Sequence, residues 1–216
     1  WMLSHGSFLN PEGLPALIRT PGYPLFLLPG FVLGIPITWA VLAQTLLSLG
    51  TIYVLYRLAL QLNLPTDVAL GSSLLLALEP LTILYVNKVM SETLFTFLVL
   101  LFVHVFLRYI RKGRIEFLLS SALILVASAY VRPITLYLPA ILVPFLAYET
   151  WHSDHSIRVL SHVLLFILLW GSGVGGWIYR NSTVADYPGF SAVSARTVYR
   201  YHAAATLAEK KGRSYS

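Results

Sequence analysis

The 216-residue chain contains no cysteine, and only 11% of its residues are charged. Without cysteine it can form neither a disulfide framework nor a zinc site with thiolate ligands. A soluble domain usually carries about twice this fraction of Asp, Glu, Lys and Arg. The histidines add no metal-binding pattern, because His104 stands alone in an apolar run and His152 and His155 share one short loop. These absences argue against a water-soluble domain and against a metal site.

Hydrophobic residues make up 57% of the chain and gather in long runs. Several runs approach about 20 residues, the length that a helix needs to cross a bilayer, whereas a signal peptide would account for only one. The net charge of +6 would also fit a nucleic-acid-binding protein. However, the basic residues stand singly at the ends of apolar runs or in one short loop, as is typical of membrane proteins. The composition therefore predicts an all-α, polytopic transmembrane bundle that binds membrane lipid and no nucleic acid.

The order of apolar runs predicts about six spans behind a short N-terminal segment. Residues 1–20 hold no span, and the prolines of residues 21–30 predict an interrupted, interfacial or partly re-entrant segment rather than a continuous helix. Glu79 falls inside the second span, where a carboxylate is costly unless it is protonated or paired. The expected spans are residues 36–56, 68–86, 93–107, the two arms of 117–148, and 159–179.

The stretch 117–148 is too long for one span. A single helix would extend about 48 Å, well beyond the roughly 30 Å hydrocarbon core, and would place Arg132 at mid-membrane. Pro133 disfavours helical geometry at Arg132. We therefore expect two shorter helices that turn at Arg132-Pro133, which lifts the arginine to an interface.

This topology divides the basic residues between two sides of the membrane. The side with more positive charge is expected to be cytoplasmic. It carries Arg57, Arg108, Arg111, Lys112, Arg114 and Arg158, whereas the other side carries Arg19, Lys88, Arg132 and Arg180.

The second side supplies the candidate binding residues. Its cations lie at the edges of apolar runs, where they suit an anionic, amphiphilic ligand such as a phosphate on a lipid. The predicted substrate-binding set is Arg19, Tyr23, Lys88, Glu92, Arg132, Arg180 and Asn181.

Each of these residues also has a purely structural interpretation. Arg132 and Arg180 could be interfacial anchors that extend to water. Lys88 and Glu92 could form an i,i+4 ion pair at a helix start. Ser91 could be the N-cap of the third span, with Glu92 favoured by the helix dipole.

Five segments carry a pattern in their order and spacing, although no single one is specific. They are Ile18-Arg19-Thr20-Pro21-Gly22-Tyr23-Pro24-Leu25-Phe26-Leu27, Glu79-Pro80-Leu81, Met90-Ser91-Glu92-Thr93-Leu94-Phe95-Thr96-Phe97, Val131-Arg132-Pro133 and Trp177-Ile178-Tyr179-Arg180-Asn181. Together these segments resemble the membrane glycosyltransferases of the GT-C fold that use polyprenyl-phosphate sugars, the protein-mannosyltransferase and aminoarabinose-transferase-like group.

The resemblance implies an inverting transfer of a sugar from a polyprenyl-phosphate donor to a lipid, glycan or protein acceptor. The active face would be extracytoplasmic, on a bacterial or archaeal plasma membrane. Arg19, Lys88 and Arg132 would hold the donor phosphate, Glu92 would orient a divalent cation, sugar or acceptor, and Arg180-Asn181 would close the cavity. The family's acidic base precedes the Pro-Gly-Tyr-Pro segment, but Glu12 lies too close to it to match. We therefore assign no catalytic base, and expect it to lie upstream of Trp1.

Two expectations concern the organisation of the chain. We expect residues 1–180 to form an incomplete transmembrane glycosyltransferase-like domain that is inactive alone, and residues 181–216 to begin an extracytoplasmic region. The alternatives are a secondary transporter or lipid flippase, which would place charges on several spans around a midplane cavity, and a non-catalytic membrane scaffold.

Overall fold

The computed structural model describes residues 8, 13, 15–151, 156–193, 198 and 206. These residues fall into two compact units. The larger unit, residues 22–173, holds most of the helices, and the smaller unit combines residues 1–21 with residues 174–216. His152, His155 and Glu12 lie outside the described residues.

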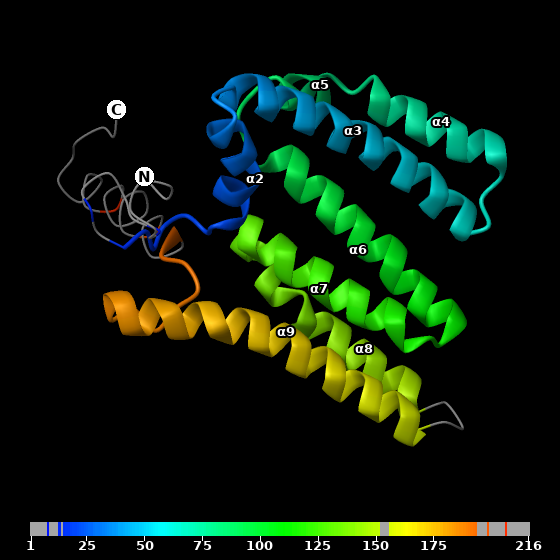
Figure 1. The fold of residues 1–216 in the computed structure, drawn as a ribbon. Coiled ribbons are helices and arrows are strands. Elements are labelled where there is room, and N and C mark those ends of the chain that lie inside the picture. Colours follow the sequence, from blue (N-terminus) through cyan, green and yellow to red (C-terminus); the bar gives the residue numbers. More distant parts are fainter. Residues whose placement is uncertain are drawn as a thin grey trace. The chain divides into compact units, whose positions relative to one another are not determined.

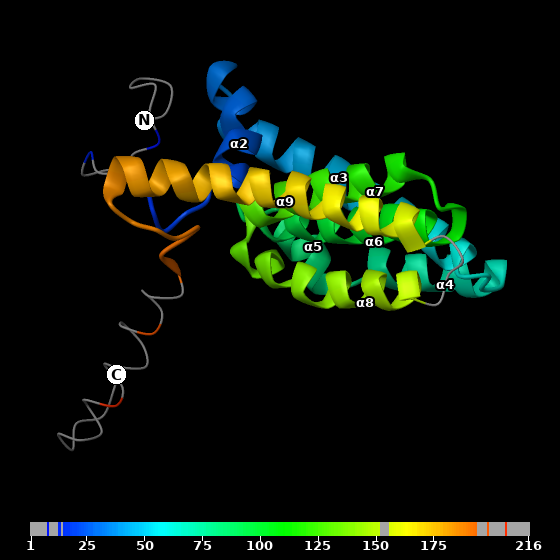
Figure 2. The same ribbon diagram turned by 90° about the horizontal axis from the view of Figure 1, so that it is seen from below.

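The described part of the chain is helical, as the composition predicts. In the larger unit α3 packs against α2, α4 and α6, and α6 also packs against α7, so that these helices lie side by side (Figures 1 and 2). In chain order, the elements are α2 (Gly22–Val32), α3 (Pro36–Gln61), α4 (Thr66–Ala77), α5 (Pro80–Val86), α6 (Glu92–Lys112), α7 (Ile115–Val131), the 3-10 helix η1 (Pro133–Tyr137), α8 (Pro139–Trp151) and α9 (Ser156–Ala185).

The proline-rich segment is a continuous helix, so the prediction of an interruption within residues 21–30 is wrong. Pro24 falls in the first turn of α2, where backbone N–H groups have no intrahelical partner and a missing one costs nothing. Pro29 lies inside the helix and removes one hydrogen bond without ending it. The chain turns after α2 at Gly34, whose φ of 73° suits glycine.

The second predicted span, residues 68–86, is a bent pair of helices, α4 and α5, which together are apolar and long enough to count as one broken span. The axes of α4 and α5 differ by 54°. Glu79 stands at the break and caps α5, since its carboxylate accepts hydrogen bonds from the backbone N–H groups of Leu81 and Thr82 and from the Thr82 hydroxyl. The carboxylate is thus partnered within its own turn.

The turn predicted at Arg132-Pro133 is confirmed. Arg132 ends α7 in extended geometry, with φ −143° and ψ 120°, and Pro133 begins η1. The buried Ser128 and Thr135 side chains tie the turn together, because Ser128 Oγ lies 3.1 Å from Thr135 Oγ1, which donates to the carbonyl of Arg132.

Four helices of the larger unit enclose one apolar core. It joins α6, α7, α8 and the first part of α9, with Leu118, Leu125 and Phe166 fully buried. The α6 residues of this core, Phe102, Phe106 and Tyr109, lie in the second half of that helix.

Three described helices are long and apolar enough to cross a membrane: α3, α6 and residues 160–185 of α9. The bent α4–α5 pair would make four. The six predicted spans are not confirmed, because α2, α7 and residues 133–146 are shorter than the roughly 20 residues that a span requires.

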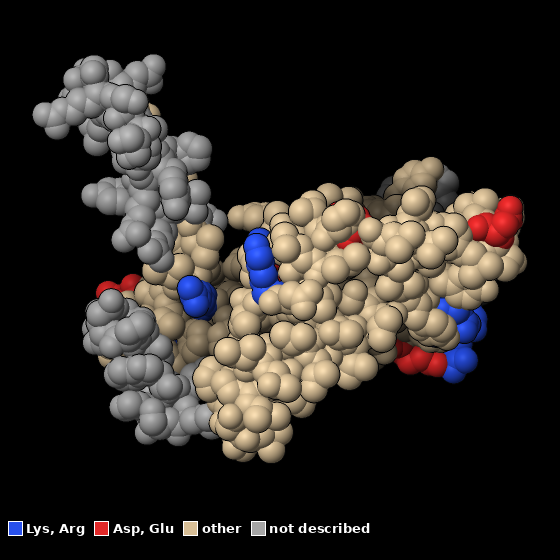
Figure 3. All heavy atoms as spheres, turned by 90° about the horizontal axis from the view of Figure 1, so that it is seen from above, with Lys and Arg blue, Asp and Glu red and all other residues tan. Residues whose placement is uncertain are grey.

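The surface of the described helices is apolar where a soluble protein would be polar. Ile37 and Leu46 on α3 are 71% and 70% exposed, and Leu75 on α4 is 73% exposed. Figure 3 shows a face on which charged side chains occupy only small patches. Such a surface is compatible with a multi-pass membrane protein whose helices face lipid.

Candidate functional site

The Pro-Gly-Tyr-Pro segment contacts the turn that carries Arg132. A Cβ atom on Gly22 would lie 2.6 Å from the backbone carbonyl of Tyr130 and 2.8 Å from the backbone nitrogen of Val131. Only glycine allows this approach, because backbone atoms of α7 cannot move aside as a side chain tip could. Gly22 therefore sets α2 directly against the end of α7.

This approach places Tyr23 over α3. The Tyr23 hydroxyl donates a hydrogen bond of 2.7 Å to Gln44 Oε1. Gln44 is fully buried near the middle of the first half of α3. Tyr23 and Gln44 therefore join α2 to α3 by a polar contact within a largely apolar bundle.

The amide of Gln44 also holds the connection between α5 and α6. Its Nε2 donates to the carbonyls of Tyr85, Val86 and Lys88, at 3.2, 2.9 and 2.8 Å. The carbonyls of Tyr85 and Lys88 also accept backbone N–H groups, from Lys88 and Met90 respectively, and Val86 is the last residue of α5. One buried side chain thus fixes the loop that leads to Glu92.

Glu92 begins α6 and forms an ion pair with Arg132, with 3.1 Å between Oε1 and Nη1. The guanidinium group also lies 5.5 Å above the ring of Phe95, one turn further along α6. The side chains of Arg132 and Glu92 are 42% and 25% exposed. A partly exposed ion pair of this kind adds about 1 kcal/mol or less to the stability of the fold. We therefore infer that the main role of Glu92 is to orient the Arg132 side chain.

A small polar cavity lies beside this ion pair. Its volume is about 40 Å³, which is room for about one water molecule. A sugar cannot fit inside it, so a ligand of that size would have to bind outside it. The polar residues that line it are Ser48, Thr51, Thr82, Tyr85, Glu92, Thr93 and Thr96, and Leu76 completes the wall.

Tyr23 remains protonated at this site. Burial raises the pKa of Tyr23 to about 12, with a smaller contribution from the negative charge of Glu92. The phenol therefore stays neutral and donates its hydrogen bond over the physiological range of pH. Tyr23 serves as a fixed donor here and is not suited to act as a base.

Lys88 reaches the site through its backbone. Its carbonyl accepts the bond from Gln44, while its side chain is exposed. The interpretation that Lys88 and Glu92 form an i,i+4 ion pair is wrong, because residues 87–91 are not helical and Glu92 pairs with Arg132 instead. Ser91 does occupy the N-cap position of α6, but its side chain makes no capping hydrogen bond.

Arg180 and Asn181 lie in the smaller unit, where they join separate segments of the chain. Arg180 donates to Asn181 Oδ1 at 3.0 Å and to the carbonyl of Phe8 at 3.1 Å, and its guanidinium lies 4.9 Å above the ring of Trp177. Asn181 is fully buried, and its Nδ2 donates to the carbonyls of Gly189 and Phe190. These contacts give the Trp-x-x-Arg-Asn segment a structural role within its own unit.

Arg19 also belongs to the smaller unit, where it is exposed at a bend. Of the seven predicted binding residues, the larger unit therefore gathers Tyr23, Glu92 and Arg132 together with the backbone of Lys88. Arg19, Arg180 and Asn181 belong to the smaller unit. Within the described residues, no three His, Asp or Glu side chains come close enough to hold a metal ion.

Gln44, which makes the most hydrogen bonds at this site, was not among the predicted binding residues. Gln44 occupies a predicted span, where an unpaired amide is expensive and therefore signals a partner. Its partners are backbone carbonyls of the next connection, which carry no signal in the sequence. The role of Gly22 was missed for a similar reason, because a close approach between α2 and α7 depends on tertiary packing.

Comparisons with known proteins assign no family to this site. No protein-family model matches the chain, and no curated protein or solved structure is significantly similar to it. The chemistry of the site has to be argued from its own contacts.

Proposed function

We propose that this chain is part of a membrane glycosyltransferase that takes a sugar from a polyprenyl-phosphate donor on the extracytoplasmic side of a membrane. The observation that supports this most is the Arg132 guanidinium, which is half-exposed at a helix turn and is held from one side by Glu92 and Phe95. A guanidinium has five N–H donors, and the Glu92 contact uses one of them. The remaining donors suit phosphate oxygens.

The surroundings of Arg132 fit an amphiphilic donor. The apolar surface of the neighbouring helices can lie along a polyprenyl chain, while the phosphate stays at the helix ends where Arg132 is found. Lys88, exposed on the adjoining connection, would add a second positive charge. In this proposal the two cations mark the extracytoplasmic side, and the more basic connections lie in the cytoplasm.

The chemistry requires stabilisation of the leaving group. As the acceptor oxygen or nitrogen bonds to the anomeric carbon, the bond between that carbon and the phosphate oxygen breaks, and negative charge develops on the phosphate. A guanidinium already fixed beside the phosphate lowers the barrier without reorganising. The acceptor proton passes to a general base, which we do not assign to a residue of this chain.

Direct binding tests this proposal independently of catalysis. In lipid nanodiscs, we expect Arg132→Ala to weaken binding of polyprenyl monophosphate by at least about tenfold, because a charge-assisted hydrogen bond contributes about 1.5–3 kcal/mol. The affinity of Arg132→Lys for polyprenyl monophosphate should lie between those of the wild-type chain and Arg132→Ala, since lysine keeps the charge but lacks the planar fork of donors. Sugar transfer from a polyprenyl-phosphate donor should fall at least as far as binding.

Arg114→Ala is the matched control, because Arg114 is an exposed arginine whose partner is Glu116. Equal binding by the Arg132 and Arg114 variants would mean that Arg132 does not contact the phosphate, and the proposal would fail.

A further inference from the structure

A second polar site lies at the opposite end of α3 and α6 from Glu92. There the last turns of the two helices border an open cavity of about 390 Å³. The side chains that give it its character are Arg57, Gln61, His104, Arg108, Arg111 and Lys112, with Tyr56 and Leu60 completing the wall.

Helical periodicity explains why these residues meet. Arg57 and Gln61 are one turn apart on α3, and His104, Arg108 and Lys112 are successive turns on one stripe of α6. Because α3 and α6 pack against each other, the two stripes face a common space. Among the described residues that line this space none is acidic, so its positive charges are not neutralised from within the wall.

Two buried polar groups at this cavity lack partners in the described part of the chain. Both amide atoms of Gln61 and the Nδ1 atom of His104 are buried and make no hydrogen bond. His104 is only 7% exposed. Burial without a partner costs about 1–3 kcal/mol for each group, and buried polar groups normally have a hydrogen-bond partner from the protein or from a bound water or ion.

We propose that this cavity binds a phosphate group, presented either by an anionic phospholipid or by a free phosphate compound. Arginine and lysine supply charge-assisted donors to the phosphate oxygens, and the Gln61 amide adds a neutral donor. The volume accommodates a phosphate together with part of a headgroup. The site is separate from the one around Arg132, since about 30 Å of α6 lies between Glu92 and Lys112 at 1.5 Å per residue.

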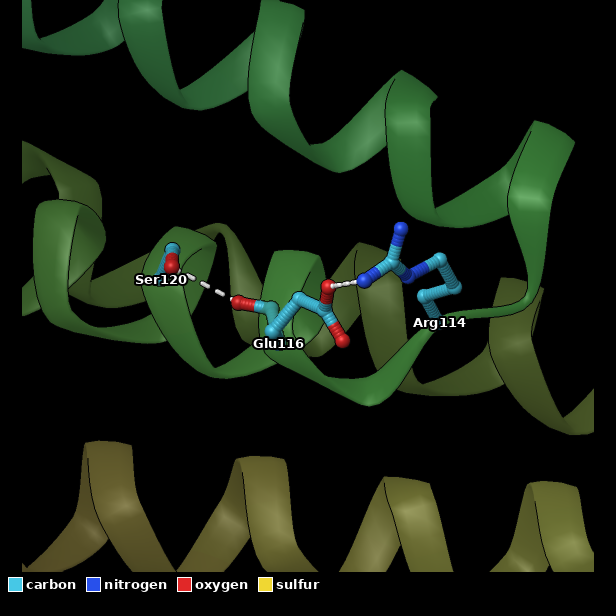
Figure 4. A network of polar contacts seen from close by, with 3 residues as sticks. All are labelled: Arg114, Glu116 and Ser120. Atoms are coloured by element: carbon cyan, nitrogen blue, oxygen red, sulfur yellow. Dashed lines mark hydrogen bonds and ion pairs between the residues drawn. The ribbon is translucent and has the colours of Figure 1, made fainter.

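Arg114 lies close to Arg111 and Lys112 in the sequence but does not belong to the proposed phosphate site. Its guanidinium pairs with the carboxylate of Glu116, whose backbone carbonyl accepts a hydrogen bond from Ser120 at the start of α7 (Figure 4). Arg114 does not line the cavity. It therefore offers a control that changes the net charge of the same loop without touching the site.

The test is calorimetric titration of the purified chain in neutral detergent. Three probes are compared: short-chain phosphatidic acid, phosphatidylcholine with the same acyl chains, and inorganic phosphate. We expect phosphatidic acid to bind at least about tenfold more tightly than phosphatidylcholine. Binding of phosphatidic acid alone identifies a lipid headgroup as the ligand, whereas comparable binding of inorganic phosphate identifies a free phosphate compound.

Variants assign the binding to the cavity. Arg57→Gln and Arg108→Gln should each weaken it about tenfold, while Arg114→Gln should leave it unchanged. Gln61→Leu gives a second measurement that does not depend on tolerance of the arginine substitutions, and it should weaken binding by a smaller factor. Equal affinity for phosphatidic acid and phosphatidylcholine, or equal effects of Arg108→Gln and Arg114→Gln, would overturn the proposal.

Discussion

The two ends of α6 differ in how their polar side chains are satisfied. At the first turn, Glu92 pairs with Arg132, and the neighbouring Gln44 uses its amide on three carbonyls and a phenol. At the last turns, His104 and Gln61 have buried atoms that find no hydrogen-bond partner among the described residues, and both line a cavity. One end is organised by contacts within the protein, and the other is arranged around open space.

The comparison distinguishes a buried amide whose hydrogen bonds are made within the protein from a buried amide that has no partner among the described residues. A buried amide with all its bonds made stabilises the arrangement around it, whereas a buried amide without partners destabilises the ligand-free chain. Both glutamines stand on α3, so the same substitution can be made at each. The difference between the two ends thereby becomes measurable.

The largest contrast is expected between Gln44→Leu and Gln61→Leu. The first substitution removes the hydrogen bonds of the Gln44 amide to three backbone carbonyls and to the Tyr23 hydroxyl, and should lower the free energy of unfolding by about 2–4 kcal/mol. The second removes an unpartnered amide, and should leave stability unchanged or raise it slightly. Unfolding in mixed micelles, followed by circular dichroism, measures both. Equal losses at the two positions would show that the unpartnered state of Gln61 has no energetic consequence.

A smaller effect is expected at Gly22, the glycine that brings α2 against the end of α7. Gly22→Ala places a Cβ against the backbone of α7, and should cost about 1–3 kcal/mol through overpacking. Gly71 on α4 is the matched control, because nothing lies within 4 Å of the Cβ it would gain. Gly71→Ala should therefore stabilise the chain by about 0.5–1 kcal/mol through helix propensity alone. If both substitutions have the same sign in mixed-micelle unfolding, the close approach of α2 and α7 is not important for stability.

The smallest effect concerns pH and is confined to alkaline solution. Because the pKa of Tyr23 is raised to about 12 in the folded chain and lies near 10 in an unfolded one, the unfolded chain loses this proton first. The contribution to stability is complete below pH 10 and disappears as the pH rises to about 12. The difference in phenolate absorbance between the wild-type chain and Tyr23→Phe reports this titration. In Glu92→Gln the pKa of Tyr23 should fall only part of the way back to its ordinary value, since burial is the larger cause of the shift. An ordinary pKa for Tyr23 in the wild-type chain would contradict its buried contact with Gln44.

Much of the helical order could be predicted from the sequence, because apolar length and proline position are local properties. The turn at Arg132 followed from the cost of a mid-membrane charge and from Pro133, and the structure has it there. The same reasoning failed at residues 21–30, where the position of Pro24 within the first turn decides the outcome more than the number of prolines does. Glu79 was recognised as costly, but its capping of a second helix was not.

The candidate site was only partly predictable. Tyr23, Glu92 and Arg132 could be grouped because they end apolar runs on one predicted side. The pairing of Glu92 with Arg132 instead of Lys88 depends on how α6 meets α7, which no local pattern encodes. The cavity between α3 and α6 was missed because its basic residues were interpreted only as markers of orientation, although Arg57 and Arg108 already lay on the same predicted side.

The bend at Glu79 has a consequence for the lipid around the protein. A straight helix through α4 and α5 would rise nearly 30 Å, but with a 54° bend the pair reaches only about 24 Å along the axis of α4. Either the acyl chains compress locally to match this short reach, or α5 rests in the headgroup layer. In the proposed transferase, this shorter reach would bring Thr82 and Tyr85, which line the small cavity together with Glu92, closer to the headgroup layer on the side of Arg132.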